Sequence, residues 1–279
     1  MIRKLVCTLV FSALAAWGLK AQSLEETYVM AQSLQAQGQY EAAIAAYERV
    51  LFFDTQQQFQ GASYRKLAIC AEALGQFKQA DRYLNFAYYL QTEPALQREI
   101  QFQQIRVRLL RQDFVSAQEE LWLLGALSSG ERGTYHLYGF VAAFGMGAYD
   151  SAQYHIDFFV GENDSLGAVV ADLFAQNDKV SKISARKAKI LSIILPGLGQ
   201  FYAGEVKAGI NSLGLTAGIL ILGIQVAIRS SALDAIFSIV PWFTRYYQGG
   251  YLRAADLAIR KRERRRAEIY QELLGVIGE

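Results

Sequence analysis

The chain has 279 residues, 52% of them hydrophobic, and a formal net charge of +2, so it can hold one large domain or two modest ones. Only three prolines occur, and no alternating β-branched run is bounded by turns, which excludes a β-rich fold and predicts an all-α chain. The only cysteines, Cys7 and Cys70, exclude a disulfide framework, and Cys70 is expected to be a small buried side chain in a helix.

The first 21 residues have the pattern of a secretory signal peptide. Arg3 and Lys4 precede an apolar run from Leu5 to Leu19, and Ala21 supplies a small residue for cleavage. An uncleaved membrane anchor is the alternative. In either case the following region is expected to cross the membrane and face the periplasm.

Residues 22–161 contain four copies of a Gly-x-aromatic-x-x-Ala pattern. The copies occupy 38–43, 75–80, 112–117 and 147–152, at intervals of 37, 37 and 35 residues. Glycine is typical of a helix end with left-handed backbone, and alanine lets two helices cross closely. The pattern therefore predicts helix pairs in which an aromatic residue begins each second helix. Gln112 stands where the other copies have glycine.

This pattern resembles the tetratricopeptide repeat (TPR) family, whose period is usually 34 residues. The first copy is the strongest match and extends to Tyr47 and Asp54. The longer intervals and the missing closing prolines depart from the family. The resemblance implies a TPR-like solenoid of about four helix pairs over 22–161, with an ordinary helical bundle as the alternative.

In a TPR solenoid the first helix of each pair lines a concave face. By that register, the resemblance implies a protein-binding groove with six principal residues. They are Tyr28, Gln32, Arg65, Ile69, Phe102 and Arg106. The arginines are expected to hold carboxylates, and the aromatic rings to offer flat contact area to an extended protein segment. In the fourth pair, apolar residues at these positions are expected to pack against the linker or the membrane domain instead.

Residues 162–185 contain Asn, Asp and Gly and are expected to form a linker before a largely apolar region at 186–250. Positions 195–204 read Leu-Pro-Gly-Leu-Gly-Gln-Phe-Tyr-Ala-Gly. This block resembles the signature of small TM2-like bacterial membrane domains. The resemblance implies two or three apolar helical segments that contact membrane lipid, but little about activity.

Five residues of this region are expected to shape its packing. They are Pro196, Gly197, Gly199, Gly214 and Gly218. Proline breaks a helix, and the first two glycines allow close backbone contact. The last two form a GxxxG face, expected to pack within the chain, with a homo-oligomer as the alternative.

Ile210 to Ile228 is long enough to cross a membrane, and Leu233 to Tyr247 is a further apolar segment. A basic helical tail at 251–279 follows, with six cations among the seven residues from Arg260 to Arg266. Three crossings would place this tail in the cytoplasm, as the positive-inside tendency favours. A re-entrant first segment would leave two crossings, with the tail on the same side as the repeats. The three-crossing arrangement is preferred.

No residue pattern indicates catalysis, a metal site or a cofactor. His136 and His155 lack metal-ligand spacing and are expected to be surface or packing residues. The sequence therefore predicts a non-enzymatic, membrane-anchored periplasmic adaptor for an envelope or secreted protein, at a bacterial inner membrane, with no nucleic-acid partner. The alternative is a component of a membrane-assembly or transport complex in which the TM2-like region is the working part.

Overall fold

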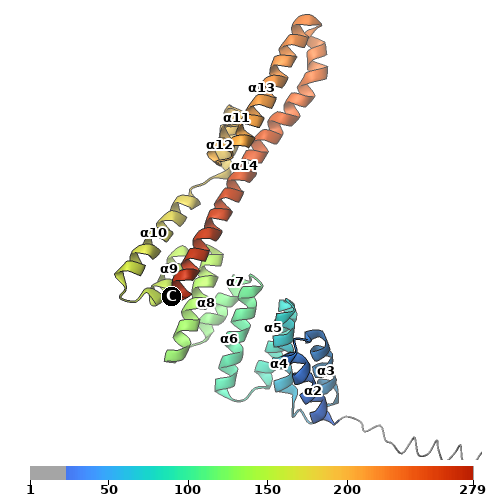
Figure 1. Ribbon diagram of the computed structural model, residues 1–279, viewed down its shortest axis with the longest axis vertical. Coiled ribbons are helices and arrows are strands. Elements are labelled where there is room, and N and C mark those ends of the chain that lie inside the picture. The colour runs from blue at the N-terminus through green and yellow to red at the C-terminus, as the bar shows by residue number, and fades with distance from the viewer. Residues whose placement is uncertain (1–22, 279) are drawn as a thin grey trace, which may run out of the picture. The chain divides into compact units, whose positions relative to one another are not determined.

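A computed structural model describes residues 23–278, so the expected signal peptide at 1–21 lies outside the described residues (Figure 1). The described residues form α-helices and no strand, which confirms the all-α prediction. The chain divides into two compact units, one ending at Ala152 and the other beginning at Gln153.

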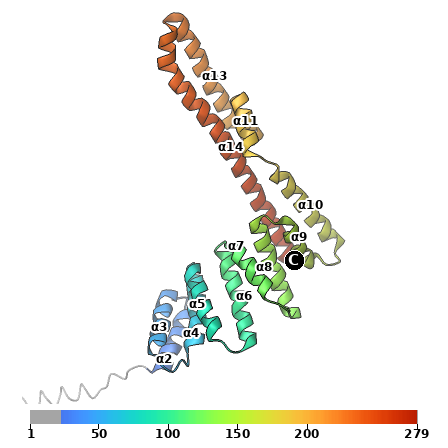
Figure 2. The same ribbon diagram turned by 180° about the vertical axis from the view of Figure 1, so that it is seen from behind.

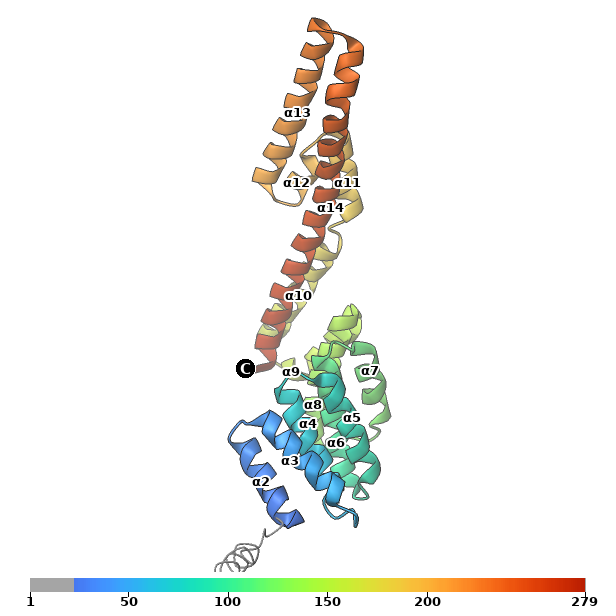
Figure 3. The same ribbon diagram turned by 90° about the vertical axis from the view of Figure 1, so that its right-hand side faces the viewer.

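The first unit consists of helices joined by short turns. They are α2 (Leu24–Ala36), α3 (Tyr40–Phe53), α4 (Gln60–Ala73), α5 (Phe77–Leu90), α6 (Pro94–Leu110), α7 (Phe114–Leu123), α8 (Ser129–Met146) and α9 (Tyr149–Val160), in which the division falls. From α2 to α8 each helix packs against the next, and α6 also contacts α8 (Figure 3).

The four copies of the glycine-aromatic-alanine pattern have one local structure. Helices α3, α5, α7 and α9 begin at the aromatic residues. Gly38, Gly75 and Gly147 have φ of +74°, +71° and +77°, and Gln112 adopts the same backbone at +61°. The four alanines, at 43, 80, 117 and 152, are fully buried. The predicted roles of the glycines, aromatic residues and alanines are confirmed, and Gln112 adopts the left-handed backbone without being a glycine.

Two polar residues of the first copy hold the structure together locally. Tyr47 is fully buried, and its hydroxyl donates to Gln35 Oε1 at 2.9 Å. The Asp54 carboxylate accepts the backbone N–H groups of Gln58 and Phe59, at 2.9 and 2.6 Å, and so closes the turn between α3 and α4. Cys70 is buried, as expected, and burial raises the pKa of its thiol.

The second unit contains the rest of α9 and five further helices. They are α10 (Asp164–Ser181), α11 (Ala185–Ile194), α12 (Leu198–Tyr202), α13 (Val206–Arg229) and α14 (Ala232–Gly278). Helix α14 is the centre of this unit, because α10, α11, α12 and α13 all pack against it. Figures 1 and 2 both show α13 running beside the first part of α14.

The expectation that residues 162–185 form a linker is wrong, because α10 covers most of this range. The Asn163 side chain caps the helix by accepting Leu166 N–H at 3.2 Å. The buried residues of α10 are Val170, Leu173, Phe174, Asn177 and Val180. Their spacing places them on one helix face, and the packing of α10 on α14 accounts for their burial. Polar residues stand between these apolar positions, and for that reason the sequence analysis did not recognise the helical periodicity of this segment.

Helix α13 is the one described helix that is both long and apolar enough to span a membrane. Most of its surface is open, as is the first part of α14, where Phe237 is 77% exposed. The first expected segment contains only α11, of ten residues, and the five-residue α12. Ten helical residues extend about 15 Å, half the thickness of a bilayer's hydrocarbon core.

Candidate functional site

Three of the six predicted groove residues line two adjoining hollows beside α4. Gln32 and Ile69 line a hollow of about 300 Å³ together with Gln35, Ala36, Tyr40 and Lys66. Arg65 and Ile69 line a second hollow of about 140 Å³ with Ala62 and Lys66. The two hollows share Lys66 and Ile69, so they form one candidate site, which we call the α2–α4 hollow.

The two predicted arginines are already paired. Arg65 Nη2 lies 2.6 Å from Glu99 Oε1, and Arg106 Nη2 lies 2.8 Å from Glu72 Oε2. Both pairs join α4 to α6. The expectation that these arginines hold a partner's carboxylates is therefore corrected, because each guanidinium has an internal carboxylate. Such partly exposed pairs typically contribute about 0–1 kcal/mol each.

The two predicted aromatic residues serve the core more than the surface. Tyr28 is half-buried, with its ring centroid 5.8 Å from that of Tyr47 and 4.9 Å from that of Phe59. Phe102 is half-buried against the core cluster formed around Ile105. Their expected role as flat contact area for a ligand is corrected, because neighbouring side chains cover much of each ring.

Lys66 is the functional candidate that the sequence analysis missed. It lines both parts of the α2–α4 hollow, and within residues 23–278 its ammonium group has no ion pair or hydrogen bond. Its position three residues before Ile69 places both on one face of α4, a signal that the sequence already contained. The hollow thus combines a cation, glutamine amides and an exposed isoleucine.

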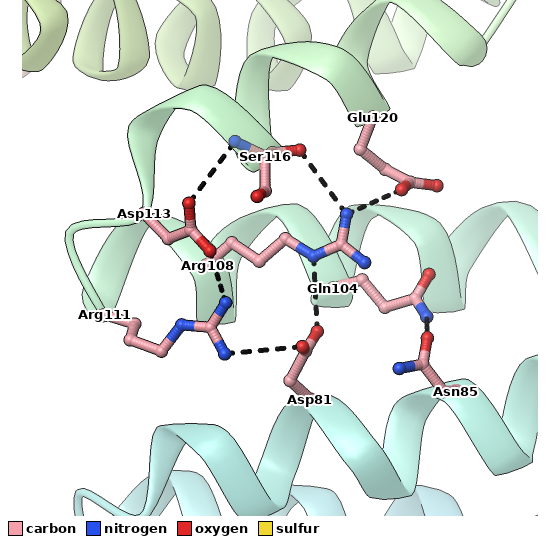
Figure 4. A network of polar contacts seen from close by, with 8 residues as sticks. All are labelled: Asp81, Asn85, Gln104, Arg108, Arg111, Asp113, Ser116 and Glu120. Atoms are coloured by element: carbon pink, nitrogen blue, oxygen red, sulfur yellow. Dashed lines mark hydrogen bonds and ion pairs between the residues drawn. The ribbon is translucent and has the colours of Figure 1, made fainter.

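A denser polar network joins α5, α6 and α7 (Figure 4). Arg108 contacts Asp81 at 3.3 Å and Glu120 at 2.7 Å, and Arg111 bonds Asp81 and Asp113. Burial opposes the charge of Arg108, but the hydrogen bond to Glu120 and the Asp81 charge raise its pKa overall. Because the carboxylates are held by internal arginines, this network links helices and offers no free group for a ligand.

Three of the second helices each carry a large exposed aromatic residue that the sequence analysis did not single out. Phe52 on α3 is 80% exposed, Tyr89 on α5 is 83% exposed, and Trp122 on α7 is 70% exposed. Each lies within the last turn of its helix. They lie on alternate helices, and singly exposed apolar residues are common on protein surfaces, so by themselves they define no binding site.

The Pro-Gly block of the second unit is tightly packed around α12. Gly197 has φ of +99°, and a Cβ there would lie 2.5 Å from Gly209 O. A Cβ at Gly199 would lie only 2.0 Å from Ala188 O. Pro196 lies in the break between α11 and α12, as expected. The predicted close packing is therefore confirmed at Gly197 and Gly199.

Gly214 and Gly218 do not pack against another part of residues 23–278. Both are exposed, and a Cβ at either would meet nothing within 4 Å. The expected intramolecular GxxxG contact is wrong, because α13 meets α14 through a different face. That face includes Gly223, where a Cβ would lie 3.1 Å from the Ile239 side chain.

A buried polar network fixes α12 to α11 and α14. Gln200 is 1% exposed; its Oε1 accepts from Ser192 Oγ at 2.8 Å and its Nε2 donates to Gly250 O at 2.9 Å. Ser192 Oγ in turn accepts Gly199 N–H at 2.9 Å. All of these hydrogen bonds are made within the chain. Gln200 of the Pro-Gly block therefore holds α11, α12 and α14 together and has no chemical role.

No chemistry-bearing cluster emerges from the part of the chain that the structure describes. Residues 23–278 hold no group of three His, Cys, Asp or Glu side chains that could bind a metal ion. His155 is buried, and burial lowers the pKa of His136. No protein-family model and no curated protein matches the chain, so the comparisons with known proteins assign no activity to it.

Proposed function

We propose that this chain is a membrane-anchored adaptor of TPR type. Its first unit faces the periplasm and binds an extended segment of an envelope or secreted protein, and its second unit is a TM2-like anchor in the inner membrane. The observation that carries the proposal is the α2–α4 hollow, where Lys66 is uncompensated beside Gln32 and Ile69. These groups suit a segment with one carboxylate next to an apolar side chain.

The anchor is proposed from the open apolar surface of α13 and the first part of α14. Ile228 on α13 and Phe237 on α14 are 79% and 77% exposed, and apolar side chains cover both helices near their connection. Water disfavours so large an apolar surface, whereas hydrocarbon accommodates it. A hairpin that crosses the membrane twice would place this surface in lipid.

Two crossings also agree with the packing of α10. This helix precedes the apolar hairpin and packs on the later part of α14, where Arg266 bonds Ser181 (Figure 1). Because α10 and this part of α14 are in contact, both must lie on the same side of the membrane. The number of membrane crossings between them must therefore be even. The short α11 and α12 would then lie at the membrane surface, which favours the re-entrant alternative over three crossings.

The leader decides the proposed orientation. The basic residues of α14 would share the periplasmic side, against the positive-inside tendency. That tendency is counted over short loops, and long exported domains translocate largely regardless of charge. The first unit, with its proposed leader, falls in the second class; the basic end of α14 is a short tail, and its proposed side follows from the packing of α10 on α14.

Site-specific photocrosslinking in intact cells tests the adaptor role. A photoreactive residue at position 32 is expected to capture one protein, and the same residue at the exposed position 78 on α5 is expected not to. Lys66→Glu should reduce capture from position 32 because it reverses the only free charge of the hollow, and Lys78→Glu should leave capture unchanged. Equal capture with and without Lys66→Glu would contradict binding at this hollow.

The alternative is an assembly or transport component in which the second unit is the working part. The rigid Ser192–Gln200–Gly250 network favours it, because it builds a defined surface beside the proposed membrane segments. Partner capture that survives all changes in the α2–α4 hollow but is lost with residues 186–250 would support this alternative.

A further inference from the structure

We propose that a hollow between α13 and α14 binds the phosphate group of an anionic membrane lipid. The inference rests on the proposed membrane insertion of these two helices. The hollow has a volume of about 410 Å³ and is lined by the inner faces of both helices. Its lining residues include Asn211, Ser212, Leu215, Arg245, Gly249 and Arg253.

Two unpaired arginines line one side of the hollow. Arg245 and Arg253 are eight residues apart on α14, roughly 80° around the helix and about 12 Å along it, and both line the hollow. Neither has an ion pair or hydrogen bond within residues 23–278, and no acidic side chain lines the hollow. Both guanidinium groups line one cavity, and an anion in it would supply the counter-charge that the described chain does not. Their planar donors suit phosphate oxygens.

The opposite wall offers uncharged polar groups. Ser212 Oγ is buried and has no hydrogen-bond partner in the described chain, and the Asn211 amide is exposed beside it. A buried hydroxyl without a partner is unfavourable, so a ligand oxygen within its reach would be stabilised. Together the two walls present donors from both helices to one anionic group.

The space itself comes from two consecutive glycines. A Cβ at Gly249 would meet nothing within 4 Å, so the missing side chain leaves the cavity open. A Cβ at Gly250 would lie 2.9 Å from Ser212 Oγ, so this glycine allows α13 to approach. Larger residues at these positions would fill the hollow or separate the helices.

The depth of the hollow suits a lipid headgroup. Gly249 lies 18 residues after Ser231, where the helices connect, which corresponds to about 27 Å along α14. The hydrocarbon core of a bilayer is about 30 Å thick. With the connection at the far surface, the hollow lies near the opposite headgroup layer, where arginines are typically found.

An acyl chain would find a path beside the hollow. Asn211, Leu215 and Leu222 occupy positions i, i+4 and i+11 on α13, so they share one face. Leu215 and Leu222 are 41% and 49% exposed and lead from the hollow towards the helix connection. A free phosphate ester would leave this apolar face uncovered, which is why we propose a lipid.

Native mass spectrometry of the full chain in detergent tests the proposal without requiring insertion. The probes are phosphatidylglycerol, phosphatidylcholine and inorganic phosphate. We expect preferential retention of phosphatidylglycerol over phosphatidylcholine, and an approximately tenfold or greater loss of that retention in Arg245→Gln/Arg253→Gln. The matched control is Arg260→Gln/Arg264→Gln, which removes the same charge from the same helix outside the hollow and should retain the lipid.

A second variant tests the cavity without changing charge. Gly249→Leu should fill the hollow and reduce phosphatidylglycerol retention, whereas Gly275→Leu, also in open space on α14, should not. Equal losses in the site and control variants would overturn the proposal in favour of a general basic surface. Retention of inorganic phosphate that displaces the lipid would overturn the lipid assignment. Protease protection in cells measures the membrane insertion of α13 and α14 independently of lipid binding. A failure of the proposed anchor can therefore be distinguished from a failure of the proposed lipid site.

Discussion

The Arg266 guanidinium donates a hydrogen bond to the Ser181 hydroxyl, with Nη2 and Oγ 3.1 Å apart. Ser181 ends α10, before the apolar hairpin, and Arg266 lies on α14 well beyond it. The bond therefore joins two parts of the chain that flank the proposed membrane segments. Such a contact cannot form across a bilayer, so it constrains the topology more directly than the charge distribution does.

Topology reporters are expected to give the same location on both sides of the hairpin. A reporter inserted after Asn163 and one fused after the C-terminus should both be periplasmic, because α10 and the end of α14 are in contact. Dual alkaline phosphatase and green fluorescent protein fusions measure this. Opposite locations for the two reporters would restore the three-crossing arrangement and contradict the packing of α10 on α14.

Gln112→Gly is expected to stabilise the turn between α6 and α7 by about 1 kcal/mol. Gln112 has φ of +61°, a left-handed conformation that costs a residue with a Cβ about 1–2 kcal/mol and glycine almost nothing. Hydrogen–deuterium exchange of the α6 and α7 amides gives the local free energy of opening.

Gly75→Ala is the matched control for that change. Its φ is +71° and a Cβ there meets nothing within 4 Å, so backbone strain alone should destabilise the α4–α5 turn by a similar amount. Slower opening in Gly75→Ala, or faster opening in Gln112→Gly, would show that the left-handed turns are not under the inferred strain.

Ala80→Phe is expected to destabilise the α4–α5 crossing by about 1–3 kcal/mol, because the alanine is fully buried in the cluster with Ala71 and Leu84. Exchange of the α4 and α5 amides measures the effect. The same substitution at the exposed Ala73, at the end of α4, serves as the control and should have little effect. Equal effects at both positions would contradict the close approach of helices at Ala80.

Gly199→Ala is expected to disrupt the packing of α11 on α12, at a cost of about 3 kcal/mol. Its Cβ would lie 2.0 Å from Ala188 O and 2.5 Å from Ser192 Oγ, so backbone must move. Thermal unfolding of the full chain in detergent, followed by circular dichroism, measures the loss. Gly214→Ala places its Cβ in open space and should leave the melting temperature unchanged or raise it.

The start of α7 is expected to lose stability in acid. The hydrogen bond from Arg111, aided by the Ser116 N–H, lowers the pKa of Asp113 below its ordinary value. The stabilisation is therefore present above the unfolded-state pKa of about 4 and is lost as pH falls through the lower folded-state value. Protection factors of the α7 amides between neutral pH and pH of about 3 measure this.

Asp113→Asn should flatten that pH dependence, because the amide still accepts from Ser116 N–H but does not titrate in this range. Asp172→Asn, on α10, is the control and should leave the α7 profile unchanged. An acid profile of α7 that is the same in wild type and Asp113→Asn would assign the effect to another group.

The sequence alone determined those features that depend on local backbone conformation or on the residues of a single helix face. The glycine-aromatic-alanine pattern predicted where α3, α5, α7 and α9 begin and which alanines are buried, because a left-handed turn and a close helix crossing constrain nearby residue types. Pro196, Gly197 and Gly199 predicted a tight break for the same reason. The long apolar run from Ile210 to Ile228 predicted a membrane-spanning segment, and it lies in α13, the one described helix that is long and apolar enough to span a membrane.

Only the tertiary structure decided which side chains remain free and which segments share a side. Arg65 and Arg106 have the same local pattern as any exposed arginine, and only the packing of α4 against α6 brings Glu99 and Glu72 to them. Lys66 stands out because its neighbours leave it unpaired. Likewise, the contact between Arg266 and Ser181 depends on the chain returning along α14, which residue order and periodicity do not encode locally.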